Sequence, residues 1–293
     1  MFNVNRLFSS VAAGVFLSLL PVGGGAFAGE TADISYARGG RVATLRLRGG
    51  VELTMMKIRA GAFTMGSPEK EVGRVDNEKQ HHVTLSRDYY LGKYEVTQGQ
   101  WRAVMGNNPS FFMKGDNYPV EQVSWNDARR FCDKLNELYA GKLPKGYHFN
   151  LPTEAQWEYA CRADTGTALN SGKDLVAATG PCPNLNEVGW YEKNSNFSTH
   201  PVGMKRPNAW GLSDMHGNVW EWCLDGEWIY SVKASTEIDP VSPTSSSKRT
   251  ARGGSWDNEA RYCRSALRTC FYHGRKYQHL GFRVALVPIG DKK

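Results

Sequence analysis

Tryptophan residues recur through most of the chain, and this distribution limits how the chain can be divided into domains. The nine tryptophans among its 293 residues run from Trp101 to Trp256 with no long stretch free of them. Because large aromatic side chains supply much of the area that a core buries, this spread favours one compact domain over two unlike halves. The composition, 41% hydrophobic and 22% charged, is that of a globular chain and excludes a disordered one.

The first 28 residues have the pattern of a secretory signal peptide. Arg6 stands in a segment without acids, residues 11–20 form an apolar run, and Ala26-Phe27-Ala28 is a small-residue cleavage site. The run is shorter than the roughly 20 apolar residues that cross a bilayer. We therefore expect residues 1–28 to be removed, leaving a periplasmic or secreted protein without an integral membrane segment.

Six cysteines follow the predicted cleavage site, and none forms a C-x-x-C pair, so a zinc knuckle or a thioredoxin-like site is poorly supported. Structural disulfides are the default in an oxidising compartment, but the spacing does not choose among the possible pairings. The net charge of +7 comes from scattered basic residues, which argues against nucleic-acid binding. The cysteines are Cys132, Cys161, Cys182, Cys223, Cys263 and Cys270.

Capping boxes, in which a Ser or Thr and a polar residue three positions later satisfy orphan backbone donors, predict three helix starts. They pair Thr97 with Gln100, Ser124 with Asp127, and Thr153 with Gln156. After the second box, apolar residues recur at helical spacing and are expected to face the core. These are Trp125, Ala128, Cys132, Leu135 and Leu138.

The rest of the chain predicts short strands separated by long irregular stretches. Residues 29–50 are interpreted as an N-terminal leader with one strand over residues 42–48. Further strands are expected over residues 81–85 and 281–287, and residues 162–219 are rich in Gly, Asn, Pro and Thr. The predicted class is α+β with low regular secondary structure.

Several short sequence motifs occur in an order typical of one family. They include Gly61-Ala62-Phe63-Thr64-Met65-Gly66-Ser67, Leu151-Pro152-Thr153-Glu154, Gly217-Asn218-Val219-Trp220-Glu221-Trp222, Arg252-Gly253-Gly254-Ser255-Trp256 and Leu280-Gly281-Phe282-Arg283. Together they resemble the formylglycine-generating enzyme (sulfatase-modifying factor) family. The resemblance covers residues 51–288 and implies a single α+β domain related to C-type lectins.

The resemblance also implies a structural calcium site. The family binds calcium through two side chains and two backbone carbonyls, and those positions correspond here to Asp214, Gly217, Val219 and Glu221. Two carboxylates and two carbonyls suit a hard cation. The alternative is that Glu221 pairs locally and the Gly-Asn pair forms only a turn.

The family's copper chemistry is not matched. Formylglycine-generating enzymes use two cysteines five residues apart after the Gly-Gly-Ser motif, and Asn258 stands at the first position. Counted from the Gly-Gly-Ser motif, Cys263 falls on the second copper-cysteine position. If Arg264 and Arg268 are instead aligned with the family's later arginines, the alignment shifts by three residues and Cys263 no longer occupies that position. The resemblance then implies a Cys161–Cys263 disulfide. Since one thiol cannot supply the two soft ligands that Cu(I) favours, no copper site is expected.

Two other branches of the family are considered. Ergothioneine-type sulfoxide synthases need an additional helical domain with iron-binding histidines, and the adjacent pair His81-His82 would point to opposite faces of a strand. The exported branch that acts in pyoverdine siderophore maturation fits a signal peptide, one domain and no copper pair.

A candidate site follows if the family's groove is retained here. Glu259, one residue past Asn258, is the first choice for an acid/base residue, although a solvated loop carboxylate is the alternative. His279 and Ser255 are the other catalytic candidates. The predicted substrate-binding residues are Trp220, Trp256, Asn258 and Arg268, with packing roles as the alternative for the tryptophans and a loop-bracing ion pair for the arginine.

Three functions remain open. The first is an oxidoreductase-like maturation enzyme acting on a peptide or peptide-derived small-molecule substrate, such as a siderophore precursor. The second is a lectin-like binding module without catalysis. The third, sulfatase activation by formylglycine generation, is disfavoured because the cysteine pair is incomplete.

Overall fold

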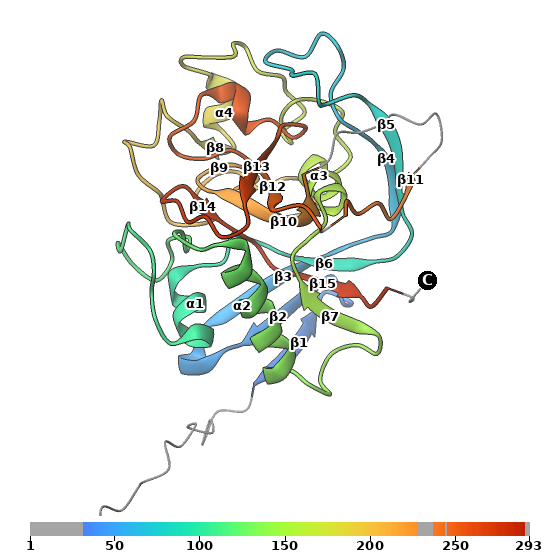
Figure 1. Cartoon of the computed structure of the whole chain (residues 1–293), viewed down its shortest axis with the longest axis vertical. Helices are drawn as coiled ribbons and strands as arrows, with labels where there is room; N and C mark the ends of the chain where they lie inside the picture. Colours follow the sequence, from blue (N-terminus) through green and yellow to red (C-terminus); the bar gives the residue numbers. More distant parts are fainter. Residues whose placement is uncertain (1–31, 228–236, 244, 291–293) are drawn as a thin grey trace, which may run out of the picture. The chain divides into compact units, whose positions relative to one another are not determined.

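The computed structural model describes residues 32–227, 237–243 and 245–290, and Figure 1 follows them in chain order. The predicted signal peptide, residues 1–28, lies outside these residues. Among the helices of the described ranges, none has the length and apolar character of a membrane span.

A six-stranded antiparallel sheet carries the N-terminal and C-terminal ends of the described chain. Its order is β1 (Asp33–Ala37), β2 (Val42–Arg46), β3 (Glu52–Ile58), β6 (Tyr89–Gly92), β15 (Ala285–Pro288) and β7 (Tyr147–Asn150). The segment interpreted as a leader thus contributes β1 and β2 to this sheet. The strand predicted over residues 42–48 ends at Arg46 and is followed by the short 3-10 helix η1 (Arg48–Gly50).

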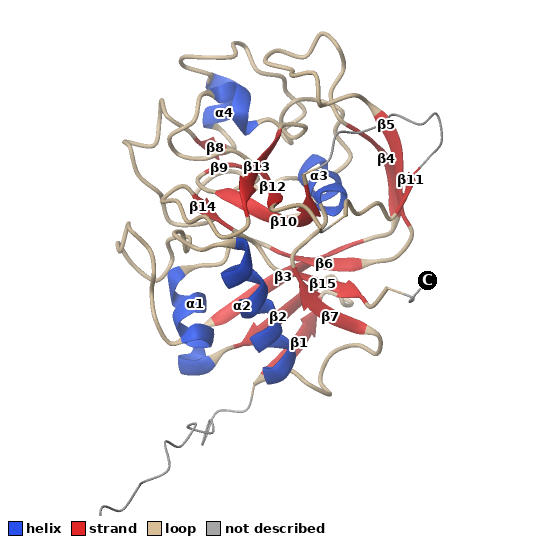
Figure 2. Cartoon of the chain, in the orientation of Figure 1, coloured by secondary structure: helices blue, strands red, loops and turns tan. Residues whose placement is uncertain are grey.

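Helices α1 (Gln98–Met105) and α2 (Trp125–Leu138) lie on one face of this sheet (Figure 2). Both begin at the predicted capping boxes, with reciprocal side-chain and backbone hydrogen bonds present. The core beneath them joins three aromatic rings: Trp101 stacks on Phe131 with centroids 5.6 Å apart, and Phe131 meets Phe282 at 5.4 Å. On α2, Ala128, Cys132 and Leu135 are fully buried, while Trp125 and Leu138 are partly buried against the same core, as their spacing predicts.

Smaller sheets build the other half of the described chain. One contains, in order, β13 (Arg268–Tyr272), β12 (Lys248–Arg252), β10 (Trp220–Gly226) and β14 (Leu280–Gly281). A second joins β11 (Glu237–Ile238), β5 (His81–Leu85) and β4 (Gly61–Met65), and a third pairs β8 (Gly189–Trp190) with β9 (His216–Gly217). Helix α3 (Glu154–Arg162) starts at the third predicted capping box, and α4 (Pro183–Asn186) and the 3-10 helix η2 (Ala260–Cys263) complete the elements.

The last predicted strand is interrupted. Residues 280–281 pair with β10 and residues 285–288 pair with β6 and β7, so residues 282–284 pass from one sheet to another. A side chain at Gly281 would meet the Val120 carbonyl oxygen at 2.4 Å, which explains why the chain has glycine at this close approach. The observed elements confirm the α+β class with extensive loops.

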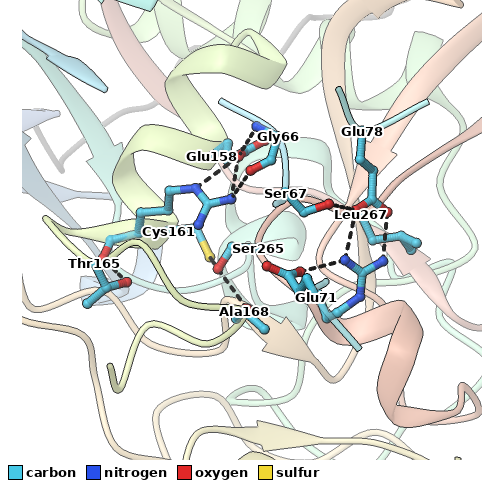
Figure 3. Close-up of polar contacts among 12 residues, drawn as sticks. Gly66, Ser67, Glu71, Glu78, Glu158, Cys161, Thr165, Ala168, Ser265 and Leu267 are labelled. Carbon is cyan, nitrogen blue, oxygen red and sulfur yellow. Dashed lines mark hydrogen bonds and ion pairs between the residues drawn. The ribbon is translucent and has the colours of Figure 1, made fainter. Parts of the chain in front are cut away.

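Buried arginine–glutamate pairs tie these loops together. Arg264 places Nη1 2.6 Å from Glu71 Oε1 and Nη2 2.7 Å from Glu78 Oε1. Figure 3 shows the carboxylates of Glu71 and Glu78 turned toward the same guanidinium group, with Ser67 beside Glu78. Because a buried charge is costly unless it is paired, these contacts fix the loop before β5 against the end of η2.

Candidate functional site

The turn after β12 delivers the side chains of the candidate site. Gly253 and Gly254 have φ values of 96° and 76°, the left-handed region that favours glycine. A Cβ at Gly254 would lie 2.6 Å from the Cys263 sulfur, so the turn can pack against η2 only without a side chain there. Two hydrogen bonds anchor the turn to the loop after β9: Gly217 N to Gly253 O, at 2.7 Å, and Trp256 N to Asn218 O, at 2.9 Å.

Ser255, Asp257 and His279 form a hydrogen-bonded chain, which we call the Ser–Asp–His chain. Ser255 Oγ lies 2.7 Å from Asp257 Oδ1, and His279 Nδ1 lies 3.0 Å from Asp257 Oδ2. Ser255 Oγ also lies 2.6 Å from Asn258 Oδ1. Burial opposes ionisation of Asp257, but the hydrogen bonds from His279 and Ser255 hold the pKa of its carboxyl below the usual value. The carboxylate therefore orients the imidazole, as in other acid–base sites.

Within the Ser–Asp–His chain, the second ring nitrogen of His279 is the atom that can react with a bound molecule. Nδ1 faces Asp257, whereas Nε2 makes no hydrogen bond within the part of the chain that the structure describes. The ring stacks on Tyr277 with centroids 5.3 Å apart and retains about a quarter of its side-chain exposure. Nε2 can therefore exchange a proton with a bound molecule.

Glu121 lies near His279 and was not predicted from the sequence. It is fully buried, accepts a hydrogen bond from Phe112 N at 2.8 Å, and leaves Oε2 without a hydrogen-bond partner in the described structure. Burial raises the pKa of Glu121 to about 7, and the nearby His279 opposes that rise. The next residue, Gln122, has a φ of 60°, and its N–H donates to Tyr277 O at 3.0 Å. This strained link joins the segment before α2 to the loop that carries His279.

The structure places Glu259 outside the Ser–Asp–His chain. Its carboxylate pairs with Arg261 at 2.5 Å and is about one-third exposed. Within the described residues, this carboxylate forms no hydrogen bond or ion pair with Asp257 or His279. Glu259 thus has the surroundings of the solvated loop carboxylate that the sequence left as the alternative, and Asp257 takes the position beside histidine.

The predicted substrate-binding residues are mostly internal. Trp220 and Trp256 are buried; Trp256 donates Nε1–H to Gln278 O at 3.2 Å and meets Phe112 edge-on at 5.3 Å. Arg268 is also buried, with Nη2 2.6 Å from Glu154 Oε1, so it braces β13 against the start of α3. These three side chains support the walls of the site in this structure, and a substrate-binding role for them is not supported.

Three exposed apolar side chains stand in the loops beside Trp256, and we call them the apolar rim. Phe111, Met113 and Phe197 are 61%, 71% and 79% exposed. Lys114 Nζ bonds Ser198 Oγ at 2.6 Å, which joins the two loops that carry them. Such exposure in neighbouring loops is typical of a binding surface.

The predicted calcium ligands fit a cation only in part. Asp214 is buried with Oδ2 bonded to Gly203 N at 2.6 Å and Oδ1 without a hydrogen-bond partner in the described structure. Burial raises its pKa to about 6. Glu221 does not fit, because Arg283 and Trp157 already bond its oxygens. The described residues contain no group of three or more His, Cys, Asp or Glu side chains placed to hold a metal. The role of the Gly217 and Val219 carbonyl oxygens stays a prediction from the resemblance.

The cysteines are unpaired in the structure, so the Cys161–Cys263 bridge is absent from it. His216 lies between them: Nε2 is 3.8 Å from the Cys161 sulfur, and Nδ1 is 2.7 Å from Cys263 O. The Cys263 sulfur instead faces Gly254. This bridge stays a prediction for the oxidised protein.

Comparison with known proteins gives consistent matches. Residues 49–287 match the family described as FGE-sulfatase, the sulfatase-modifying factor enzyme 1-like domain. A protein of Paenibacillus barcinonensis called chaperone protein LppX is 35% identical over 60% of this chain and 71% of its own length. The formylglycine-generating enzyme of Thermomonospora curvata is 34% identical over 66% of this chain and 63% of its own length.

Two solved structures extend the comparison. Treponema denticola variable protein 1 has a TM-score of 0.72 and 32% identity, covering 84% of this chain and 99% of that protein. PvdO from Pseudomonas aeruginosa has a TM-score of 0.69 and 25% identity, covering 88% of this chain and 99% of that protein.

Proposed function

Since the chain belongs to the sulfatase-modifying factor enzyme 1-like family, we propose that it is an exported, oxidoreductase-like maturation enzyme. Its substrate would be a peptide or peptide-derived molecule in the periplasm, such as a siderophore precursor. The observation that carries this proposal is the Ser–Asp–His chain, which leaves His279 Nε2 without a hydrogen-bond partner among the described residues. The likeness to PvdO supports the siderophore precursor as the first substrate to test.

The chain's own residues supply the proton-transfer part of such a reaction. Asp257 holds the Nδ1–H of His279, and Nε2 accepts a proton from the substrate. The imidazolium that forms is stabilised by Asp257 and by Glu121, whose pKa of about 7 changes its charge near neutrality. Ser255 fixes the rotamer of Asp257.

Formylglycine generation is not supported by the sulfur atoms in this region. Asn258 takes the position of one copper cysteine in the resemblance, and burial raises the pKa of the Cys263 thiol well above its usual value. A buried neutral thiol is a poor nucleophile and a poor metal ligand.

A structural calcium ion remains part of the proposal, resting on Asp214. The ion would lie at the Asp214 carboxylate with backbone oxygens of the same loop, and it would neutralise charge without taking part in proton transfer.

The experiment is complementation of a Pseudomonas aeruginosa strain that lacks PvdO. The wild-type chain should restore pigment, while His279→Gln and Asp257→Asn should lower the rate of maturation by about 100-fold or more. Glu259→Gln is the matched control and should behave as wild type, and thermal unfolding of each purified variant checks its fold. Normal pigment with His279→Gln would remove the Ser–Asp–His chain from the mechanism, and no rescue by wild type would reject the siderophore substrate.

The second candidate is a binding module without catalysis, favoured by the apolar rim and by the relative named as a chaperone. In that case Phe111→Ser and Phe197→Ser would abolish binding to its partner protein, whereas His279→Gln would leave that binding unchanged. The two functions are therefore separated by the same set of variants.

A further inference from the structure

A concave region of the surface shares no residue with the Ser–Asp–His chain. It is a cleft of about 870 Å³ between the β1–β2 turn, the end of β3 and the loops after α3 and around Trp210. We call it the basic cleft. Its charged lining residues are Arg38, Arg41, Lys57, Arg59 and Asp164.

The positive charge of the basic cleft is only partly neutralised. Lys57 pairs with Asp88 at 2.9 Å. Arg38, Arg41 and Arg59 are exposed, and no carboxylate of the described residues lies within ion-pair distance of them. The acid in the lining, Asp164, accepts a hydrogen bond from Trp210 Nε1 at 3.1 Å. Three guanidinium groups thus remain available to an anion.

The backbone holds charged residues at the cleft in an unfavourable conformation. Arg38 has a φ of 52° at the start of a turn that continues through Gly39 and Gly40, also in the left-handed region. Asp164 has a φ of 71° after the end of α3. Non-glycine residues are uncommon in this region, and such strain is concentrated at binding sites.

An aromatic wall completes the cleft. Trp210 is partly exposed and meets Tyr159 at a centroid distance of 4.9 Å and an interplanar angle of 70°. The contact with Tyr159 and the bond to Asp164 fix the orientation of the indole. A fixed indole beside arginines offers an apolar surface for the C–H face of a sugar ring together with donors for its acidic groups.

We propose that the basic cleft binds an acidic oligosaccharide through its sulfate or carboxylate groups. Arginine forks pair with such groups through two parallel hydrogen bonds. Contact with a lipid surface would call for exposed large apolar side chains, and none of the described residues that line the cleft is of that kind. The concave shape and the indole wall favour a sugar over an extended acidic peptide.

Direct binding to a heparin-derived hexasaccharide, measured by calorimetry on the mature protein, tests this assignment. The double variant Arg38→Glu/Arg41→Glu should bind about tenfold or more weakly, and binding by the wild type should weaken as salt rises. The matched control Lys70→Glu/Arg275→Glu changes the net charge equally at exposed positions outside the cleft and should retain wild-type affinity. Trp210→Ala should also weaken binding, with a thermal unfolding scan to verify its fold.

Two comparison ligands test whether the basic cleft prefers an acidic oligosaccharide to an acidic peptide or a lipid surface. Poly-L-glutamate and vesicles of phosphatidylglycerol should bind more weakly than the hexasaccharide. Equal or tighter binding of either would overturn the oligosaccharide assignment, as would an equal loss of affinity in the control variant.

Discussion

Arg283 and Glu221 form a fully buried two-pronged ion pair, with Nε 2.6 Å from Oε2 and Nη2 2.6 Å from Oε1. Trp157 Nε1 donates to the same carboxylate at 2.7 Å, and Arg283 also bonds the Gly92 carbonyl at 3.0 Å. The pair connects α3, β10 and the crossing segment before β15. It also removes Glu221 from the set of free cation ligands.

Removal of one partner of this pair should strongly destabilise the fold. Arg283→Met leaves a buried carboxylate without its cation, so we expect a loss of about 3–5 kcal/mol in the free energy of unfolding, measured by urea denaturation. The double variant Arg283→Met/Glu221→Gln should recover part of that loss, because no unpaired charge remains. A loss below 1 kcal/mol for the single variant would contradict this account.

The pH dependence of stability should report on Asp214. Its folded-state pKa is raised from 3.8 to about 6, so the folded state binds the proton more tightly than the unfolded state. The stability from this group is therefore fully present below pH 3.8 and is lost as pH rises through about 6. In the presence of a chelator, Asp214→Asn should be more stable than wild type at pH 7.5, by on the order of 2 kcal/mol, with no advantage at pH 3.5.

If Asp214 holds calcium, the added ion should reverse the order of stability of the wild type and Asp214→Asn. Added calcium at pH 7.5 should raise the melting temperature of the wild type and leave that of Asp214→Asn unchanged. The reason is that the bound ion supplies a positive charge beside the buried Asp214 carboxylate. Equal responses of the two proteins would remove Asp214 from the proposed calcium site.

Local sequence signals located the starts of α1, α2 and α3, because the information in a capping box lies within four residues, whereas the short α4 has no such box and was not predicted. Ser124 and Asp127 show this: Ser124 Oγ bonds Asp127 Oδ2 at 2.6 Å, and α2 begins at the next residue, Trp125. The resemblance likewise placed Ser255 and His279 in one site, where the structure joins them through Asp257.

The acidic partners of His279 could not be chosen from the sequence. The position of Glu259 directly after Asn258 makes it the first choice from the sequence, but the direction of each side chain depends on the turn that Gly253 and Gly254 impose, and Asp257 is the residue that faces His279. Glu121 lies far from His279 in sequence, and its proximity depends on the contact between Gln122 and Tyr277. Such pairings arise from tertiary packing, which no local pattern records.

The capping box of α2 provides a test of local stabilisation. Ser124→Ala removes the hydroxyl that accepts from Asp127 N, and we expect a loss of about 1 kcal/mol in the free energy of unfolding. Ser35→Ala, at an exposed position of β1, is the matched control and should change stability by less than about 0.5 kcal/mol. Similar losses in both variants would show that the cap contributes nothing specific.

Thiol reactivity should separate Cys270 from the other five cysteines in the reduced protein. Cys270 is partly exposed on β13, whereas the others are buried, and burial raises the pKa of Cys132 and Cys161 to about 12. Because the thiolate is the reactive form, a maleimide should label Cys270 first in the native protein, and Cys270→Ser should abolish that early labelling. The remaining thiols should react only after unfolding in urea, as followed by mass spectrometry. Early labelling of Cys161 or Cys263 would mean that the packing around His216 opens in solution, and protection of both in protein recovered from an oxidising compartment, even after unfolding, would support the predicted bridge.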